Sequence, residues 1–137
     1  MNQKIKTLME KSGLKYTVTE DGGYIRATFS LRNDRTQLVV IDAEPDTFEG
    51  SNYEDFDIVS PICLESELTP DKALKLLKAM DSAKAGAVKI RFGMVVVAYD
   101  LNPNVSPEVF KNIVGLMAVE ADRLEQIVEP NGQKDRF

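Results

Sequence analysis

Residues 24–44 read YIRATFSLRNDRTQLVVIDAE, and this stretch decides the fold class. Residues 24–31 and 36–44 are rich in Val, Ile, Thr and aromatic residues, and the polar RNDR between them carries the Asn-Asp signal of a turn. The segment YTVTED, residues 16–21, has the same character and ends at Gly22-Gly23. The sequence therefore predicts an antiparallel meander of three strands.

Two further segments extend this sheet. Residues 56–64, FDIVSPICL, predict a fourth strand, in which Pro61 indicates either a sheet edge or a bulge because proline cannot donate to a ladder. Residues 88–101, VKIRFGMVVVAYDL, have strand propensity throughout. Gly93 leaves two alternatives for this segment, one long strand or a very tight hairpin, and we expect two strands.

Three segments predict helices, at residues 2–12, 69–82 and 106–128. The last two begin alike, with a hydroxyl, a proline and an acid (Thr69 to Asp71 and Ser106 to Glu108), which is a helix start signal rather than a duplicated functional motif. We expect the second helix to bury Ala73, Leu76, Leu77 and Met80. The elements together predict an α+β fold with an antiparallel sheet of about five strands and three helices.

Length and charge limit the classes of function. A chain of 137 residues predicts one domain, which we place at residues 1–129 with a short tail at 130–137. The net charge of -5 disfavours nucleic acid as a partner, because phosphate binding requires clustered Lys and Arg. No apolar run suits a secretory signal or a membrane span, so we expect a cytoplasmic protein that does not bind membranes.

Few residues suggest catalysis. The chain has no histidine, and Cys63, in the apolar stretch IVSPICLE, is expected to be a buried thiol. The acidic run Asp42 to Glu49 offers oxygen ligands for calcium, but its spacing fails the EF-hand pattern, and a solvated loop is the better interpretation. No glycine motif for phosphate binding occurs. We therefore predict no catalytic, cofactor-binding or metal-ligating residue and no cofactor.

The last helix carries more apolar surface than one core contact needs. Its main stripe is widened on one flank by Val109, Ile113 and Leu116. One alternative is that the whole face packs on the sheet of its own domain. The other is that this flank contacts a second copy of the chain or a partner, which would make Val109, Ile113 and Leu116 an interface and the protein a homodimer.

The order of elements resembles the type III secretion chaperone-like fold. Several short sequence segments are similar to those of its YbjN-like branch, which is linked to sensory transduction regulation. These segments are IVSP at 58–61, ALKLLKAM at 73–80, ADRLE at 121–125 and GQKDRF at 132–137. The resemblance implies a non-enzymatic protein, since secretion chaperones are typically homodimers that hold an extended segment of a client. One departure is the short connection between KIRF and GMVVVAYDL, which leaves the strand count open.

These observations favour a protein-binding module, either chaperone-like or a regulatory adaptor, that holds a client peptide on a sheet edge or in an apolar groove. The alternative is a small-molecule-binding sensory regulator, which a deep pocket with convergent polar groups would favour. The third hypothesis is an enzyme, which would require a pocket with a strongly perturbed carboxylate or thiol.

Overall fold

The computed structural model describes residues 1–132, which contain three α-helices and seven strands. In chain order these are α1 (Gln3–Ser12), β1 (Thr17–Val18), β2 (Tyr24–Ser30), β3 (Thr36–Asp42), β4 (Asp46–Thr47), β5 (Glu54–Leu64), α2 (Pro70–Ala79), β6 (Ala87–Arg91), β7 (Met94–Leu101) and α3 (Pro107–Val128). The predicted α+β class is confirmed. Residues 133–137 lie outside the described residues. They include most of the closing segment GQKDRF and most of the tail predicted at 130–137.

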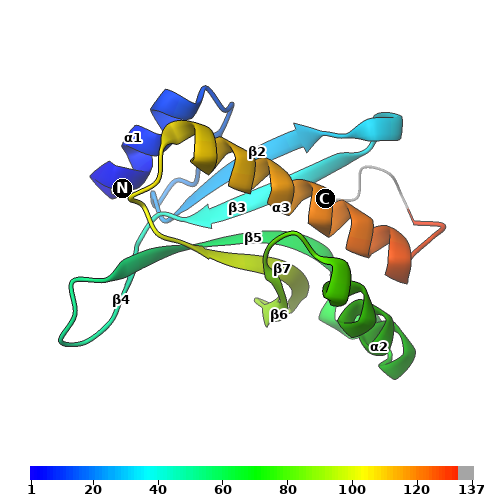
Figure 1. The fold of residues 1–137 in the computed structure, drawn as a ribbon. Coiled ribbons are helices and arrows are strands. Elements are labelled where there is room, and N and C mark those ends of the chain that lie inside the picture. Colours follow the sequence, from blue (N-terminus) through cyan, green and yellow to red (C-terminus); the bar gives the residue numbers. More distant parts are fainter. Residues whose placement is uncertain (133–137) are drawn as a thin grey trace.

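The strands form one antiparallel sheet in the order β1-β2-β3-β5-β7-β6, with β4 paired to the start of β5 (Figure 1). The predicted meander is present as β1, β2 and β3, although β1 and β4 have only two residues each. The other five strands have five residues or more, which agrees with the expected number of about five.

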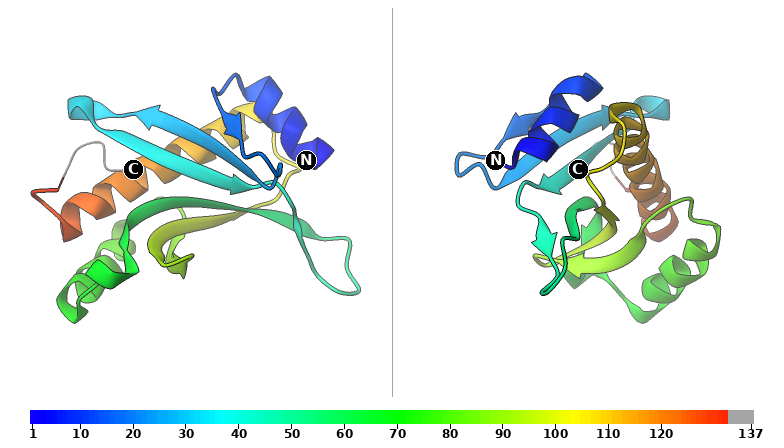
Figure 2. Two further views of the ribbon diagram at one scale, coloured as in Figure 1. Left: turned by 180° about the vertical axis from the view of Figure 1, so that it is seen from behind. Right: turned by 60° about the vertical axis from the view of Figure 1, so that its left-hand side comes forward.

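The sheet opens between β3 and β5. These two strands pair only at Val40–Val59 and Ile41–Ile58, and Figure 2 shows them separating toward the end where the C-terminal half of α3 lies. The buried side chain of Gln37 bridges the gap, because its Nε2 donates to the carbonyl oxygen of Pro61 at 2.7 Å and to Ser60 Oγ at 3.1 Å. Side-chain hydrogen bonds thus replace backbone pairs that the separation removes.

Pro61 marks a bulge. The register of β5 against β7 shifts between Pro61 and Cys63, so the bulge alternative is confirmed. The edge alternative is wrong, because β5 lies inside the sheet between β3 and β7. Proline is tolerated at this position because β3 has already turned away from β5. A bulge bends its strand and increases the local twist, and β5 and β7 curve strongly beyond this point.

The segment at residues 88–101 is a hairpin, as expected. Strands β6 and β7 are joined by two residues, Phe92 and Gly93, whose φ angles are 51° and 73°. Positive φ at both central positions is typical of a type I′ turn, the tightest connection that matches the twist of paired strands.

Helix starts follow the sequence signals. The hydroxyl of Thr69 accepts a hydrogen bond from the amide of Lys72 at 3.2 Å, and that of Ser106 accepts one from the amide of Val109 at 3.1 Å. Both prolines occupy the first turn. The similarity between the segments Thr69 to Asp71 and Ser106 to Glu108 is therefore explained by their common role in starting a helix.

Helices α1 and α3 cover one face of the sheet (Figure 1). The core between the two helices and the sheet is formed by their inward side chains, including Ile5, Met9, Val39, Ile58, Val97, Phe110 and Met117, each 0% exposed. A nearly buried ion pair fastens the start of β3 to α3, with Arg35 Nε at 2.5 Å from Asp122 Oδ1. None of the helices within residues 1–132 combines the length and apolar character that crossing a bilayer requires.

Helix α2 packs against the C-terminal end of α3 rather than on the sheet. The guanidinium of Arg123 donates to the carbonyl oxygen of Ala79 at 3.2 Å, and Lys72 forms an ion pair with Glu129. The prediction that Leu77 is buried is wrong, because its side chain is 68% exposed. An end contact covers less of a helix than a sheet does, so only Leu76 becomes fully buried.

Candidate functional site

The sheet has one covered face and one open face. Side chains alternate along each strand, so the residues that follow or precede each core residue point away from α1 and α3. On β3 and β5 the open face presents Leu38, Val40 and Val59, which are only partly buried. Apolar side chains on a sheet face that no helix covers are a candidate binding surface.

Curvature of the sheet turns this face into a groove. Asp57 pairs with Asp100 on β7, whereas Arg91 pairs with Met94, six positions away along the same strand. In a flat sheet these positions would be roughly 20 Å apart. Arg91 Nε nevertheless lies 3.5 Å from Asp57 Oδ2, so the tip of the β6–β7 hairpin curls over the open face.

An aromatic contact closes one side of the groove. The rings of Tyr24 on β2 and Phe92 in the hairpin turn lie 6.3 Å apart at 86°, an edge-to-face arrangement. Phe92 is otherwise 85% exposed, and it adopts a left-handed conformation that is unfavourable for a residue with a Cβ. The turn therefore holds an exposed aromatic side chain over the groove at some cost in backbone strain.

The groove has a volume of about 710 Å³ and an apolar floor. That volume falls within the range of about 300–1,000 Å³ that is typical of ligand-binding sites. Its floor is formed by side chains from three strands, namely Leu38, Val40, Val59, Pro61, Met94 and Val96. Its polar walls are formed by Arg26, Asp42, Asp46, Asp57 and Arg91.

One end of the open face is acidic. Asp46 lies directly opposite Asp55 in the β4–β5 pair, and Asp57 lies directly opposite Asp100 in the β5–β7 pair. Asp42 comes one residue after Ile41, the partner of Ile58, and so lies beside Asp57. Like charges directly opposite one another on a sheet are destabilising. This acidic end, defined as Asp42, Asp46, Asp55, Asp57 and Asp100, adjoins the apolar floor.

Two of these carboxyl groups are poorly solvated. Burial raises the pKa of Asp57 above its usual range, while the nearby guanidinium of Arg91 opposes part of that shift. Asp57 Oδ1 is buried without a hydrogen-bond partner among the described residues. Burial is also the largest cause of the raised pKa of Asp55, followed by repulsion from Asp100, Asp46 and Asp57. The ionised forms of both groups are thus disfavoured in the folded protein.

Two cations face this end. Lys89 Nζ lies 3.9 Å from Asp100 Oδ2, and Arg91 approaches Asp57 as described above. Both contacts are long, and the side chains of Lys89 and Arg91 are 36% and 39% exposed. Loose, partly exposed ion pairs contribute little stabilisation, so the acidic end keeps an excess of negative charge.

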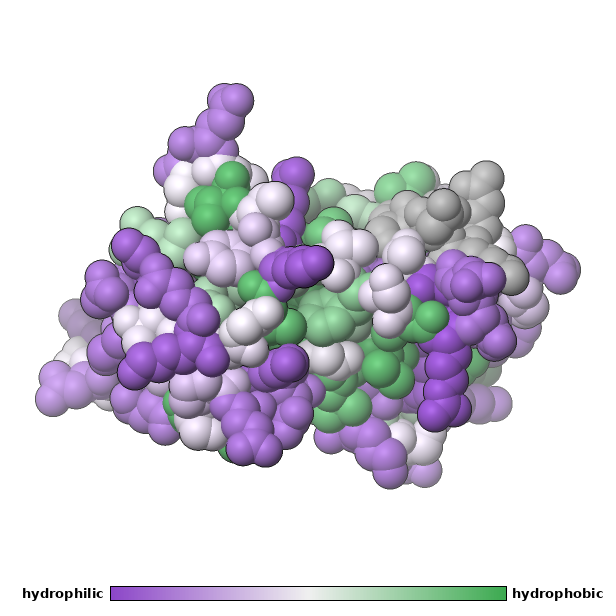
Figure 3. Space-filling view, turned by 90° about the horizontal axis from the view of Figure 1, so that it is seen from above, coloured by the Kyte–Doolittle hydropathy of each residue, from purple (hydrophilic) through white to green (hydrophobic). Residues whose placement is uncertain are grey.

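The predicted interface residues lie on the other side of the molecule, on α3. Val109 is 45% exposed, whereas Ile113 and Leu116 are partly buried, and Ile113 packs against the core. Val119, which is 49% exposed and lies one turn after Leu116, extends this apolar flank beyond the predicted residues. Figure 3 shows apolar residues gathered near the middle of the molecule seen from above, with hydrophilic residues toward both ends.

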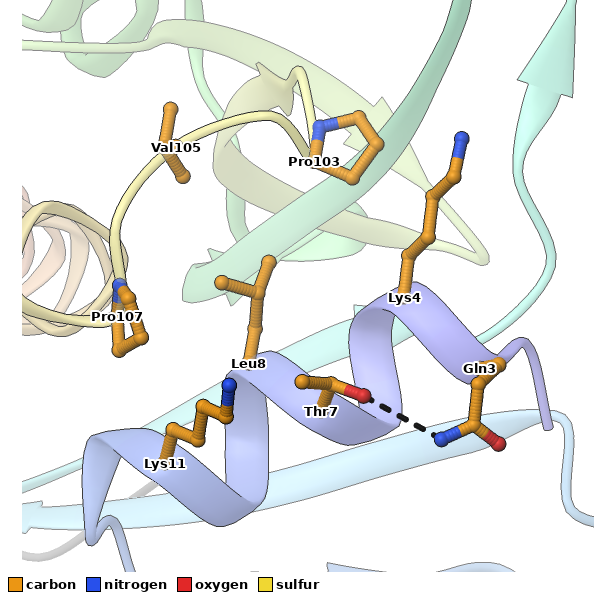
Figure 4. Close-up of a pocket in the computed structure, with 8 residues that line it drawn as sticks. All are labelled: Gln3, Lys4, Thr7, Leu8, Lys11, Pro103, Val105 and Pro107. Carbon is orange, nitrogen blue, oxygen red and sulfur yellow. Dashed lines mark hydrogen bonds between the residues drawn. The ribbon is translucent and has the colours of Figure 1, made fainter.

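A second, smaller cavity of about 330 Å³ lies between α1 and the loop that precedes α3 (Figure 4). Leu8, Pro103, Val105 and Pro107 form its apolar side, and Lys4 and Lys11 flank it from the helix. Gln3 donates a hydrogen bond to Thr7 within its lining at 3.3 Å, and Lys4 forms an ion pair with Glu54. This cavity has less than half the volume of the groove on the open face, so the groove is the stronger candidate.

Sequence reasoning identified neither the groove nor its acidic end. The prediction that Cys63 is buried is confirmed at 1% exposure. The run Asp42 to Glu49 forms the end of β3, the short β4 and a polar loop, and two of its acids, Asp42 and Asp46, line the groove. Within residues 1–132, no three or more His, Cys, Asp or Glu residues are placed so that they could hold a metal ion. One sequence signal could have indicated the groove. In β3 and β5, apolar residues occur on both faces of the strand, whereas a strand with one solvated face carries them on one face.

Comparisons with known proteins leave the family as a prediction. No protein-family model matches the chain, and no curated protein sequence matches it. The resemblance to the YbjN-like branch therefore rests on the order of elements and on the four short segments named in the sequence analysis.

Proposed function

We propose that this protein is a non-enzymatic, cytoplasmic protein-binding module, chaperone-like or regulatory, that holds an extended client peptide in the groove on the open sheet face. The observation that carries the proposal is the uncovered apolar floor, in which Val40, Val59 and Met94 form a continuous surface across three strands. Binding an apolar segment there removes that surface from water, which is favourable by roughly 25 cal/mol per Å².

The free edge of β6 also supports a peptide ligand. Within the part of the chain that the structure describes, strand β6 pairs with β7 alone, so its other edge presents backbone N–H and C=O groups along Ala87–Arg91. An extended peptide can add to such an edge through main-chain hydrogen bonds while its alternate side chains enter pockets. Ile90, 48% exposed on this strand, adds apolar contact area.

The non-enzymatic part of the proposal rests on the composition of the groove. The chain contains no histidine, and the residues lining the groove within residues 1–132 include no Ser, Thr, Cys or Lys. Burial is the largest cause of the raised pKa values of Asp55 and Asp57, and repulsion from Asp100 adds to both.

Affinity capture from the source cells, followed by mass spectrometry, tests the proposal with three forms of the protein. Val40→Arg places a charged chain in the groove, whereas Leu77→Arg adds the same charge to an exposed position on α2. A client that binds the wild type and Leu77→Arg but not Val40→Arg supports the groove. A client retained equally by all three, or none at all, contradicts it.

We also propose that the protein forms a homodimer through the flank Val109, Ile113 and Leu116. Charging Ile113 would disturb the core against which it packs, so the exposed Val109 is the better site for a test. Val109→Asp should convert a dimer to a monomer in sedimentation velocity while preserving the far-ultraviolet circular dichroism spectrum. A wild-type protein that is monomeric at all concentrations measured would contradict this proposal.

A second candidate, a small-molecule-binding sensory regulator, is favoured by the size of the groove and by its convergent polar groups, Arg26, Asp57 and Arg91. A thermal-shift screen of small metabolites distinguishes the two. Stabilisation of the wild type but not of Val40→Arg by one compound, without any peptide client, would favour the sensor.

A further inference from the structure

We propose that the acidic end of the groove recognises a Lys or Arg side chain of the bound peptide, so that the preferred ligand is an extended segment with the pattern apolar-x-apolar-x-Lys/Arg. The proposal rests on the proposed peptide-binding function and specifies the chemistry of the peptide. Asp42, Asp46 and Asp57 are the acids of this end that the ligand would meet first, because all three line the groove.

The burial of Asp55 and the carboxylates around it indicate that a cation supplied by the ligand would be stabilising there. This residue is only 6% exposed, and its charge is opposed by the carboxylates of Asp100, Asp46 and Asp57, with a smaller compensating effect from Lys89. It faces Asp46 across the β4–β5 pair and lies two positions from Asp57 on the same face of β5. A buried carboxylate is normally paired or hydrogen-bonded, so a carboxylate surrounded by others is a site that a ligand cation would neutralise.

Asp57 gives a second, separate indication. Among the described residues its Oδ1 is buried without a partner, while its Oδ2 makes the long contact with Arg91. An incoming ammonium or guanidinium group can supply the donors that this carboxylate lacks, and hydrogen bonds between charged groups are stronger than those between neutral ones. Among residues 1–132, five carboxylates at this end outnumber the nearby cations Lys89, Arg91 and Arg26, so the charge complement is cationic.

Strand geometry sets the spacing of the pattern. Side chains on one face of β5 recur every second residue, so Asp57, Val59 and Pro61 follow one another along the groove at intervals of roughly 6.6 Å. A peptide extended along the same direction has the same repeat. Its apolar side chains at the first and third positions would contact the floor near Pro61 and Val59, and the side chain at the fifth position would then reach Asp57.

A matched peptide library tests the inference. The frame is GS-Φ-T-Φ-T-Lys-SG, in which Φ is Val, Ile, Leu, Met or Phe, and two control sets replace Lys by norleucine or Glu. Fluorescence anisotropy with the full-length protein should show that the Lys set binds about five- to tenfold more tightly than the norleucine set, and the Glu set least tightly. Asp57→Asn should remove that preference, whereas Asp81→Asn, which deletes an exposed charge at the end of α2, should leave it unchanged.

A charge reversal provides an independent check on folding. Asp46 is exposed and lines the groove, so Asp46→Lys should fold normally and shift the preference toward the Glu set. Equal binding of all three sets to the wild type would overturn the cation inference while leaving the peptide groove in place. If no member of any set binds, the proposed function fails, and this inference fails with it.

Discussion

Replacing Asp55 by Asn should stabilise the folded protein at neutral pH while it weakens the binding of cationic peptides. Asp55 is 6% exposed, and its charge is opposed by three carboxylates, of Asp46, Asp57 and Asp100, against one ammonium group, of Lys89. Two like-charge interactions therefore remain uncompensated. A like-charge pair on a sheet is worth about 0.2–1 kcal/mol, so removing the charge should stabilise the protein by about 1 kcal/mol.

The sign of the pH dependence follows from the raised pKa of Asp55. Because its folded-state pKa lies above its unfolded-state value, the native protein binds the proton more tightly, and the stability that this proton supplies is lost as pH rises through the folded-state pKa. The gain from Asn should therefore be largest at neutral pH and should shrink as the pH falls toward the usual range of an aspartate.

Urea unfolding of the wild type and Asp55→Asn, at about pH 7.5 and about pH 4.5, measures both effects. Asp81→Asn is the matched control, since it removes an exposed charge outside the groove. A lower midpoint for Asp55→Asn at neutral pH, or a gain that does not depend on pH, would show that Asp55 is not a desolvated carboxylate among like charges. Stabilisation on removal of this charge would support the proposal that Asp55 contributes to binding, because functional sites often carry a cost in stability.

Three further predictions concern other parts of the fold. Arg35→Ala should cost about 3–5 kcal/mol in urea unfolding, because it leaves the nearly buried carboxylate of Asp122 without its cation; a loss no larger than that of the exposed Arg32→Ala would contradict this. Gly86→Ala should lower the unfolding free energy by about 2 kcal/mol, because Gly86 has a φ of 83° and a Cβ there would lie 2.9 Å from the carbonyl oxygen of Ala98. A Gly115→Ala control should instead stabilise α3 by up to about 1 kcal/mol, since its Cβ meets only Phe29 at an ordinary 3.8 Å; equal losses in the two variants would refute the steric explanation. Phe92→Asn should change stability by less than about 1 kcal/mol, because relief of the left-handed strain offsets loss of the Tyr24 contact, and yet it should weaken peptide binding in the anisotropy assay; unchanged binding would show that the aromatic side chain does not form part of the site.

Local chemistry determined most of the secondary structure. The strand alternation of residues 24–44, the cap signals at Thr69 and Ser106, and the positive-φ residue Gly93 each act within a few residues, and each produced the expected element. The α+β class and the antiparallel meander followed from these local patterns. The burial of Cys63, which lies in a strand of the sheet, was also predicted from the apolar residues around it.

Only the tertiary structure decided where elements pack and where charges meet. The helical pattern of α2 could not show that the helix docks at the end of α3, and this docking leaves Leu77 exposed. The groove arises because a bulge after Pro61 bends β5 and brings Arg91 and Phe92 over the open face, across many residues of intervening chain. Asp46, Asp55, Asp57 and Asp100 become neighbours only through strand pairing, which depends on register between segments distant in sequence. The sequence thus determined the elements, whereas the long-range pairing that creates the candidate site was decided by the three-dimensional fold.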